Sequence, residues 1–294
     1  MEEQKPFSVM HSYHLAGIIP VAKQPYDFKL PWDDCLMPIA HNYLAVERAV
    51  AECAYVGCET IWIVCHKDMQ PLIKKRIGEK TTDPLRLNSR TKYLSRVKRA
   101  IQIYYVPIHP NDRDKRDCLS WSVLYGALSA FLVSAKLSKW ITPDKYFVSF
   151  PWGIYSSWNM REHRKAISSD RNFCTSYNGK TIKDGLMLPF TFGSDDWKKA
   201  RDNFKELAKE QYFKRKERGK IKYDFSLDKI FKSYIIDNTC EIEKFSQIDS
   251  WEAYQDYMRT DLSLEMKRPG FLRPAKWNEI THYKEEDDEP GEEI

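Results

Sequence analysis

The chain has 294 residues, of which 42% are hydrophobic and 14% aromatic. This length fits one large domain or two small ones, and this composition excludes a chain that is disordered throughout. The net charge of +5 is uneven: residues 284–294 hold one lysine and seven acidic residues, a net of −6, so the remaining body carries +11. A basic body is typical of proteins that bind phosphate-bearing ligands, nucleic acid or an acidic partner, and also of an ordinary solvated surface.

The sequence shows neither a membrane span nor a secretion signal. No apolar run is long enough to cross a bilayer, and residues 1–13 are polar where a signal peptide would be basic and then apolar. The seven cysteines are scattered, odd in number and without CxxC spacing, so we expect reduced, buried thiols rather than a disulfide framework or a zinc site. These features predict a cytoplasmic protein, located in the host cytoplasm or the virion if the chain is virus-encoded.

The first half of the chain alternates short apolar runs with helical patterns. After an N-terminal arm at residues 1–13, buried strands are predicted at residues 15–21, 60–65, 101–106 and 146–150, and helices at residues 43–55, 67–77 and 120–137. Gly57 and Gly78 are expected to end the first two helices. The third helix is apolar on nearly every face, so we expect it to be buried against a sheet.

Strands that alternate with helices at this spacing predict an α/β fold, with a mostly parallel, Rossmann-like sheet and helices on both faces. We expect the strand at residues 15–21 to be central, between the strands at residues 60–65 and 146–150. Ligands of such sheets bind beyond the carboxyl ends of the strands. The loops that follow those ends are at residues 22–38, 107–119 and 151–157.

The second half is less regular. The sequence predicts strands at residues 171–177 and 186–191, a helix from residue 194 to about 218, a closing strand at residues 245–248 and a final helix at residues 250–258. Eleven lysines and arginines lie between residues 198 and 222, interleaved with aromatic residues, a pattern that fits nucleic-acid binding or a long solvated helix. We therefore divide the chain into the arm, a domain at residues 14–262, and an extended C-terminal segment at residues 263–294 with an acidic tail.

Four stretches of the sequence carry a resemblance to a known family. The stretches AGIIPVAKQPYDFKLPWDDCLMPI and YLAVERAVAECAYVGCETIWIVC give the order strand, loop, Pro-Ile step, helix and second strand. Further along, SVLYGALSA and QIDSWEAY give a buried helix and a late strand followed by Asp249 and a helix. This layout, over roughly residues 14–260, resembles that of the sugar nucleotidyltransferases. The resemblance implies a fold of the GT-A, or nucleotide-diphospho-sugar transferase, type.

The resemblance also implies chemistry. Members of this family join a nucleoside triphosphate to a sugar phosphate and release pyrophosphate, with Mg²⁺ stabilising the phosphate charge. The resemblance implies that Asp249 is a metal ligand. The residues by themselves allow a second interpretation, in which Asp249 is a neighbour of a helix N-cap at Ser250.

The sequence departs from the family's pattern at the positions that carry this chemistry. The glycine-rich loop with its arginine is replaced by AKQPYDFKL at residues 22–30, and the lysine before the Pro-Ile step by Asp33, Asp34 and Cys35. The acid that ends the fourth strand in the family is missing from residues 149–153.

Six residues on the predicted ligand edge are candidates for nucleotide binding: Lys23, Lys29, Arg113, Arg116, Ser120 and Ser122. The basic residues would hold phosphate and the serines would contribute hydroxyl groups. We expect any nucleotide to lie over residues 21–29, the loop at 107–122 and the start of the third helix. Solvated side chains and helix capping explain the same residues without a ligand. His66, directly after the second strand, is a further candidate, with a structural histidine as its alternative.

Three functions are consistent with these observations. The first is a nucleotidyltransferase with a nucleoside triphosphate, a sugar phosphate and Mg²⁺ as its ligands. The second is a catalytically inactive relative that acts as a binding or assembly module with a protein partner. The third is a glycosyltransferase that would use Asp112 and Asp114 as an Asp-x-Asp metal motif. Nucleic acid is a weaker candidate partner, and no membrane partner is expected.

Overall fold

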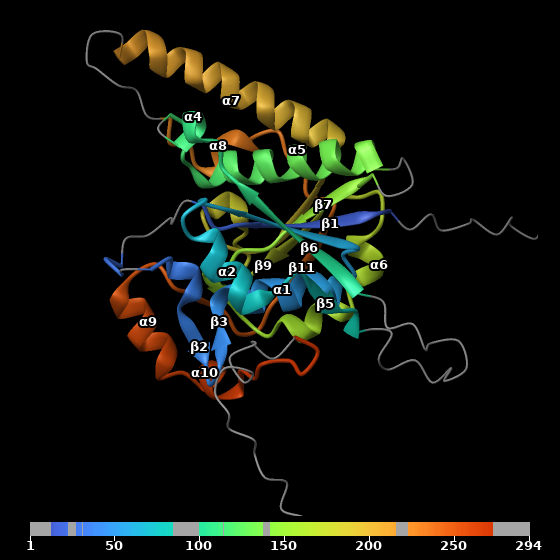
Figure 1. Ribbon diagram of the computed structural model, residues 1–294, viewed down its shortest axis with the longest axis vertical. Coiled ribbons are helices and arrows are strands. Elements are labelled where there is room, and N and C mark those ends of the chain that lie inside the picture. Colours follow the sequence, from blue (N-terminus) through green and yellow to red (C-terminus); the bar gives the residue numbers. More distant parts are fainter. Residues whose placement is uncertain are drawn as a thin grey trace, which may run out of the picture.

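A computed structural model describes residues 13–22, 28–30, 32–84, 100–113, 115–137, 142–215 and 223–272. Its central sheet has eight strands in the order β11-β9-β10-β7-β1-β4-β6-β5 (Figure 1). Their bounds are β1 Leu15–Pro20, β4 Thr60–Cys65, β5 Lys80–Thr82, β6 Ala100–Pro107, β7 Lys145–Val148, β9 Phe173–Ser176, β10 Phe190–Gly193 and β11 Asn238–Glu241. The neighbours of β1 and β4 are all parallel, which confirms the predicted α/β sheet.

Strand β1 lies at the centre of this sheet, as predicted. It pairs in parallel with β4 on one side and with β7 on the other. Every residue of β1 is buried. Leu15 and Ile19 join the core on one face of the sheet, whereas Ala16 and Ile18 join the core on the other. The unbroken apolar run of this strand therefore reflects burial on both faces.

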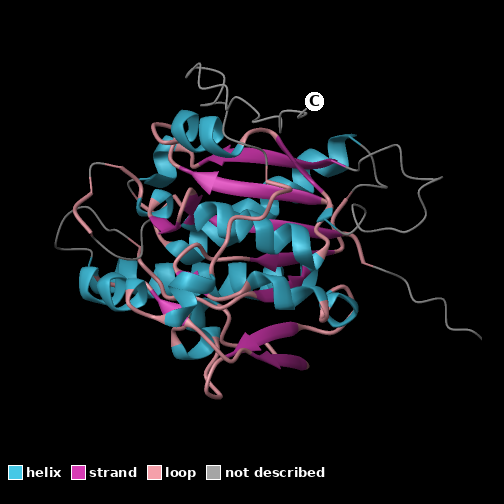
Figure 2. Cartoon of the chain, turned by 90° about the horizontal axis from the view of Figure 1, so that it is seen from below, coloured by secondary structure: helices cyan, strands magenta, loops and turns pink. Residues whose placement is uncertain are grey.

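Helices lie on both faces of the sheet, above and below it in Figure 1, and Figure 2 views the molecule from below. Helix α1 (Ala45–Val56) packs on one face and α5 (Leu119–Leu137) on the other, against β1 and β4. Two glycines permit these close approaches. A Cβ atom at Gly17 would lie 2.7 Å from Cys53 Sγ of α1, and one at Gly126 of α5 would lie 2.7 Å from Val64 Cγ2 of β4.

The remaining helices continue this two-sided arrangement (Figure 1). They are α2 Gln70–Ile77, α4 Pro110–Arg113, α6 Arg164–Ile167, α7 Ser194–Arg215, α8 Leu227–Ile230, α9 Trp251–Met258 and α10 Asp261–Glu265, with short 3-10 turns η1 Asp34–Leu36, η3 Ser157–Arg161 and η4 Ile182–Asp184. Gly57 ends α1 in the left-handed conformation, with φ of 90°, as its position predicts. Helix α7 extends beyond the sheet above α5.

Several elements differ from the sequence-based prediction. Helix α1 begins only after a small hairpin of β2 (Pro38–Ala40) and β3 (Tyr43–Leu44). The predicted closing strand at residues 245–248 does not join the main sheet. Its two strand residues, β12 (Ser246–Gln247), pair with β8 (Gly153–Ile154), because the chain after β7 turns away from the sheet and offers a separate edge.

The chain beyond α10 packs against α1 as far as it is described. Arg268 donates through Nη2 to Glu47 Oε1 at 3.0 Å, and the Phe271 ring meets the Tyr55 ring edge-on at a centroid distance of 5.2 Å. The side chain of Leu272 is buried in the same core. The predicted division of the chain at residues 13 and 262 stays a prediction.

An ion pair ties together the amino-terminal ends of three strands. His14 Nε2 lies 3.0 Å from Glu59 Oε2, just before β4. The backbone amide of His14 donates to Asp144 Oδ2 at 2.9 Å, just before β7. Hydrogen bonding to Glu59 raises the pKa of His14, which outweighs the lowering by burial.

We expect His14 to make the stability of the fold depend on pH. Because its pKa is higher in the folded chain, the folded chain binds more protons above the ordinary histidine pKa, and the stabilisation falls as pH rises through the raised value. The difference in unfolding free energy between wild type and His14→Gln should therefore shrink between mildly acidic and mildly alkaline pH in urea titrations. The exposed His41 supplies the control His41→Gln, which should show no such trend. A constant difference for His14→Gln would contradict the prediction.

Candidate functional site

The loops that follow β1, β4, β6 and β7 form one edge of the sheet, called here the carboxyl edge. Three backbone hydrogen bonds hold the beginnings of these loops together: Val21 N to Val64 O at 2.8 Å, Ile108 N to Cys65 O at 3.1 Å, and Ser149 N to Ile18 O at 3.0 Å. This is the edge at which parallel α/β sheets bind ligands. Of the candidate residues, Lys23 lies outside the described residues, and Lys29 lies in an exposed turn with φ of 55°.

Two buried acids lie beneath the carboxyl edge after β1. Asp33 and Asp34 are only 3% and 1% exposed. Burial, together with the nearby Asp33 carboxylate, raises the pKa of the Cys35 thiol and raises that of Cys65, at the end of β4, to about 12. Asp33 therefore lies close to both thiols. Acids occupy the position at which the family resemblance implies a lysine, and a phosphate group would be repelled there rather than attracted.

The polar and charged side chains after β4 and β6 contact one another. His66 Nε2 lies 3.3 Å from Asp117 Oδ1, and Arg113 Nη1 lies 2.8 Å from Asp68 Oδ2. The guanidinium of Arg116 lies 4.9 Å from the centre of the Trp121 ring. Both predicted arginines are thus brought to the carboxyl edge, and each already contacts a side chain of the protein. Nucleotide binding by them stays a prediction.

The two candidate serines point into the protein. Ser120 and Ser122 lie in the first turn of α5 and are fully buried. Ser120 Oγ donates to the carbonyl of Phe225 at 2.7 Å, and Ser122 Oγ donates to the carbonyl of Cys118 at 3.2 Å. The Ser120 bond fixes the start of α5 to the segment before α8, and the Ser122 bond is local to the start of the helix. The hydroxyl hydrogens are used inside the fold, and a ligand role for either serine stays a prediction.

A buried polar cluster lies where β7 ends. The Ser149 hydroxyl donates to Glu52 Oε2 of α1, and Arg48 Nη1 donates to the same oxygen at 3.2 Å. Arg48 Nη2 also donates to the carbonyl of Phe150, and its guanidinium lies 5.0 Å from the centre of the Tyr155 ring. The side chains of Arg48 and Glu52 are at most 1% exposed. Burial raises the pKa of Glu52, and Arg48 and Ser149 oppose this effect.

The sequence analysis missed this cluster, although the sequence contains a signal for it. Arg48 and Glu52 stand four residues apart in a helix whose other residues are mostly apolar, so both face the same side. Charged residues are almost never fully buried unless they are paired. The pair was therefore visible, but its third member was not, because Ser149 is 97 residues from Glu52 along the chain.

Asp249, the metal ligand that the resemblance implies, lies immediately before α9. It is exposed and directly precedes Ser250, the N-cap of α9, whose Oγ accepts a hydrogen bond from the amide of Ala253 at 3.1 Å. The described residues contain no group of three or more His, Cys, Asp or Glu side chains able to hold a metal ion. They therefore do not fit the Mg²⁺ site that the resemblance implies, and Asp249 as a metal ligand stays a prediction.

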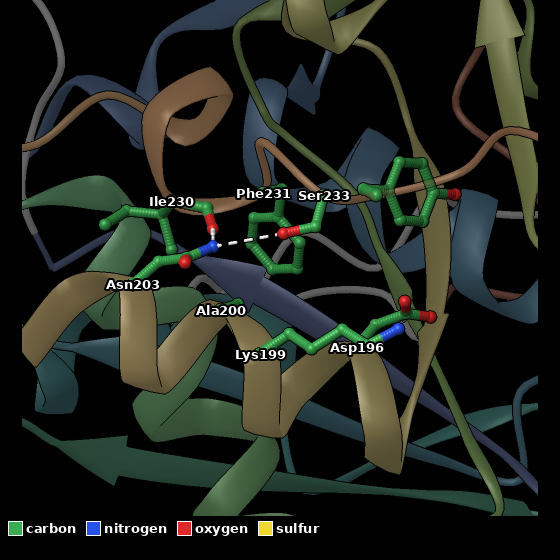
Figure 3. Close-up of a pocket in the computed structure, with 8 residues that line it drawn as sticks. Asp196, Lys199, Ala200, Asn203, Ile230, Phe231 and Ser233 are labelled. Atoms are coloured by element: carbon green, nitrogen blue, oxygen red, sulfur yellow. Dashed lines mark hydrogen bonds between the residues drawn. The ribbon is translucent and has the colours of Figure 1, made fainter. Parts of the chain in front are cut away.

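A hollow lies away from the carboxyl edge, between α7 and the turn that follows α8 (Figure 3). Asn203 Nδ2 donates to the carbonyl of Ile230 at 3.0 Å across it, and Asp196 Oδ2 accepts from Asn172 Nδ2 at 3.0 Å. It has no volume that a water molecule could occupy. The hollow is a packed contact between elements rather than a ligand site.

Comparisons with known proteins agree with this fold. No protein-family model matches the sequence, and no curated protein matches it. A protein of Bacillus anthracis assigned as a glucose-1-phosphate thymidylyltransferase, solved with sucrose, is similar in structure with a TM-score of 0.52 and 11% identity, over 88% of this chain and 98% of that one. A nucleoside-diphosphate-sugar pyrophosphorylase of Vibrio cholerae gives 0.49 and 13% identity over 83% and 100% of the two chains. The first similarity confirms, at the level of the fold, the resemblance to the sugar nucleotidyltransferases.

Proposed function

We propose that the chain is a non-catalytic relative of the sugar nucleotidyltransferases, one that keeps their fold as a binding or assembly module in the cytoplasm. The observation that carries this proposal is the end of β7. Where the family resemblance implies a metal-binding acid, the chain has Ser149, and its hydroxyl is turned inward to the buried Arg48–Glu52 pair. Nucleotidyl transfer needs carboxylates that hold Mg²⁺ against the phosphates. Here the carboxylate that contacts Ser149 is that of Glu52, which is buried and paired with Arg48.

The rest of the carboxyl edge supports the same proposal. Asp33 and Asp34 place buried negative charge where a triphosphate needs cations. Arg113 is within 2.8 Å of an acid, and the Ser120 hydroxyl donates to a backbone carbonyl. A fold does not determine an activity, because scaffolds can persist after their chemistry has been lost. The alternative is an active enzyme with a nucleoside triphosphate, a sugar phosphate and Mg²⁺, acting through Lys23, Lys29 and Asp249. Nucleic acid is a weaker candidate ligand.

Thermal unfolding with nucleotides distinguishes the two functions. A ligand that binds only the folded state raises the melting temperature. For the full chain we expect no Mg²⁺-dependent rise with ATP, GTP, CTP, UTP or dTTP, and no pyrophosphate release when a hexose 1-phosphate is added. A Mg²⁺-dependent rise together with pyrophosphate release, both abolished by Asp249→Asn, would establish the enzyme and overturn the proposal.

Two further variants test whether a nucleotide-dependent shift in melting temperature comes from the predicted site. Lys29→Ala removes a candidate loop cation, and it should weaken nucleotide binding only if the enzyme interpretation is correct. Ser250→Ala is the matched control beside Asp249. It removes the cap of α9 and should cost about 0.5–2 kcal/mol of stability. It should leave any nucleotide-dependent shift unchanged, because the cap hydroxyl accepts only from the helix.

A further inference from the structure

The carboxyl-terminal half of α5 exposes large apolar side chains. Phe131, Leu132 and Leu137 are 45%, 49% and 64% exposed. Helix α5 is long and apolar enough to cross a membrane, yet its residues Val123, Leu124 and Ala127 are buried in the core. Single exposed apolar residues are ordinary, but a contiguous set on one element marks an interaction surface.

A cavity of about 250 Å³ opens beside these residues, between α5 and the first turns of α7. Its walls are mainly apolar: Leu128, Phe131 and Leu132 of α5, Tyr146 of β7 and Trp197 of α7. The indole of Trp197 donates to the carbonyl of Leu124 at 3.0 Å, which holds α7 against α5 at this point. The wall of the cavity is therefore fixed, and its exposed side is open to another molecule.

Three apolar residues of α5 that line this cavity share one face of the helix with Ala135, which is not part of the lining, and the four repeat with a helical period. Leu128, Phe131, Leu132 and Ala135 stand at positions i, i+3, i+4 and i+7, and together they are called here the α5 stripe. If a second α5 packs antiparallel about a two-fold axis between Phe131 and Leu132, then Phe131 faces Leu132 of the partner subunit. Likewise, Leu128 faces Ala135 of the partner subunit. Each of these contacts occurs twice, related by the two-fold axis, as an isologous interface requires.

The charged residues of α7 beside the cavity indicate which kind of molecule could bind there. Along α7, Lys198 lies 3.1 Å from Asp195, and Arg201 lies 3.3 Å from Asp202. Both signs alternate on one helix face. An anionic membrane or a nucleic acid calls for a rim of one positive sign. A rim of alternating sign is complementary to a second rim of the same kind.

We propose that the α5 stripe and its cavity form the interface of a homodimer, in which α5 of one copy packs antiparallel against α5 of another. The partner in the proposed assembly function is then a second copy of this chain. The assignment of the dimer to an assembly role rests on the proposed function, whereas the existence of the dimer does not. The interface itself is tested without nucleotide. A nucleotide-binding result can therefore overturn the proposed function and leave the dimer intact, and the reverse also holds.

Sedimentation velocity over a range of concentrations tests the dimer. The full chain should sediment as a dimer, and Leu132→Glu should sediment as a folded monomer with the circular dichroism spectrum of the wild type, because Leu132 is half-exposed. Leu264 of α10 is 78% exposed and provides the matched control. The variant Leu264→Glu should remain dimeric. A wild type that is monomeric at every concentration overturns the proposal, as does a monomer that floats with anionic phosphatidylserine vesicles.

Cysteine cross-linking tests the register. The native cysteines give little background, because all seven are buried. Leu132→Cys lies beside the two-fold axis and should form a disulfide-linked dimer under mild oxidation by dissolved oxygen with a copper catalyst. Ala135→Cys should not, because two copies of residue 135 would lie about 10 Å apart along the helix axis, beyond the reach of a disulfide. Equal cross-linking at both positions, or none at residue 132, overturns the antiparallel arrangement.

Discussion

Replacing Arg48 with methionine should lower the free energy of unfolding by about 3–5 kcal/mol. The variant keeps most of the side-chain volume but removes the charge that faces Glu52. It also removes the donors to the carbonyl of Phe150 and to Glu52 Oε2. A carboxylate would then be left in the core with only the Ser149 hydroxyl as a donor. Urea titration of the two proteins, followed by far-ultraviolet circular dichroism, measures the difference.

The pH dependence of this difference gives a second readout. Burial raises the pKa of Glu52 in the folded chain, so the ionised form destabilises the fold, and stability is lost as pH rises above the ordinary glutamate pKa. Without Arg48, this loss should be larger. The destabilisation by Arg48→Met should therefore be smaller at mildly acidic pH, where Glu52 can bind a proton, than at neutral pH.

Two further variants separate the charge from the packing. The double variant Arg48→Met, Glu52→Leu replaces the pair with apolar side chains and should recover much of the lost stability, since buried ion pairs contribute little net free energy. The exposed pair of Lys74 and Glu79, 2.6 Å apart, supplies the control. Lys74→Met should cost less than about 1 kcal/mol. A double variant as unstable as Arg48→Met alone would contradict the proposed role of the pair.

The central strands β1, β4 and β7 were predictable because they are short and buried on both faces, whereas the polar edge strands β5 (KTT) and β11 (NTCE) were not predicted. The bounds of β4 match the prediction, because Gly57 ends the helix before it. The bounds of β1 differ from the prediction by a single residue, because a Pro-rich loop follows this strand in the sequence. The placement of β12 was not predictable. Its pairing with β8 depends on how the chain turns after β7, which no local pattern encodes.

At the carboxyl edge, the sequence predicts which residues lie there but not which side chains they contact. The sequence places Arg113 and Arg116 at this edge correctly, because loops after parallel strands must lie there. It does not show that Arg113 is already paired with Asp68, because that contact spans 45 residues. Nor does it show that the hydroxyl of Ser120 donates to Phe225, 105 residues away. The direction of a side chain in a loop is set by distant partners, and so the chemistry of an edge is harder to predict than its location.

A buried lysine holds the start of β7 to the segment between α6 and β9. Lys145 is 2% exposed, and its ammonium group donates to the carbonyls of Ile167 and Ser169, both at 3.0 Å, and of Arg171 at 2.5 Å. Three carbonyls around one ammonium satisfy all of its donors. Burial lowers the pKa of Lys145 from 10.5 to about 8, against the opposing effect of nearby carboxylates.

Replacing Lys145 with methionine should destabilise the fold by about 3 kcal/mol, because buried carbonyl acceptors lose their donor. The loss should also change with pH. Since the folded chain releases this proton at a lower pH than the unfolded chain, Lys145 makes the fold more stable as pH rises from about 8 toward 10.5. The gap between wild type and Lys145→Met should therefore widen in urea titrations at alkaline pH. Lys80→Met, at an exposed lysine of β5, is the control and should change neither stability nor its slope with pH. A Lys145→Met protein as stable as wild type would show that the three carbonyls are satisfied without the ammonium group.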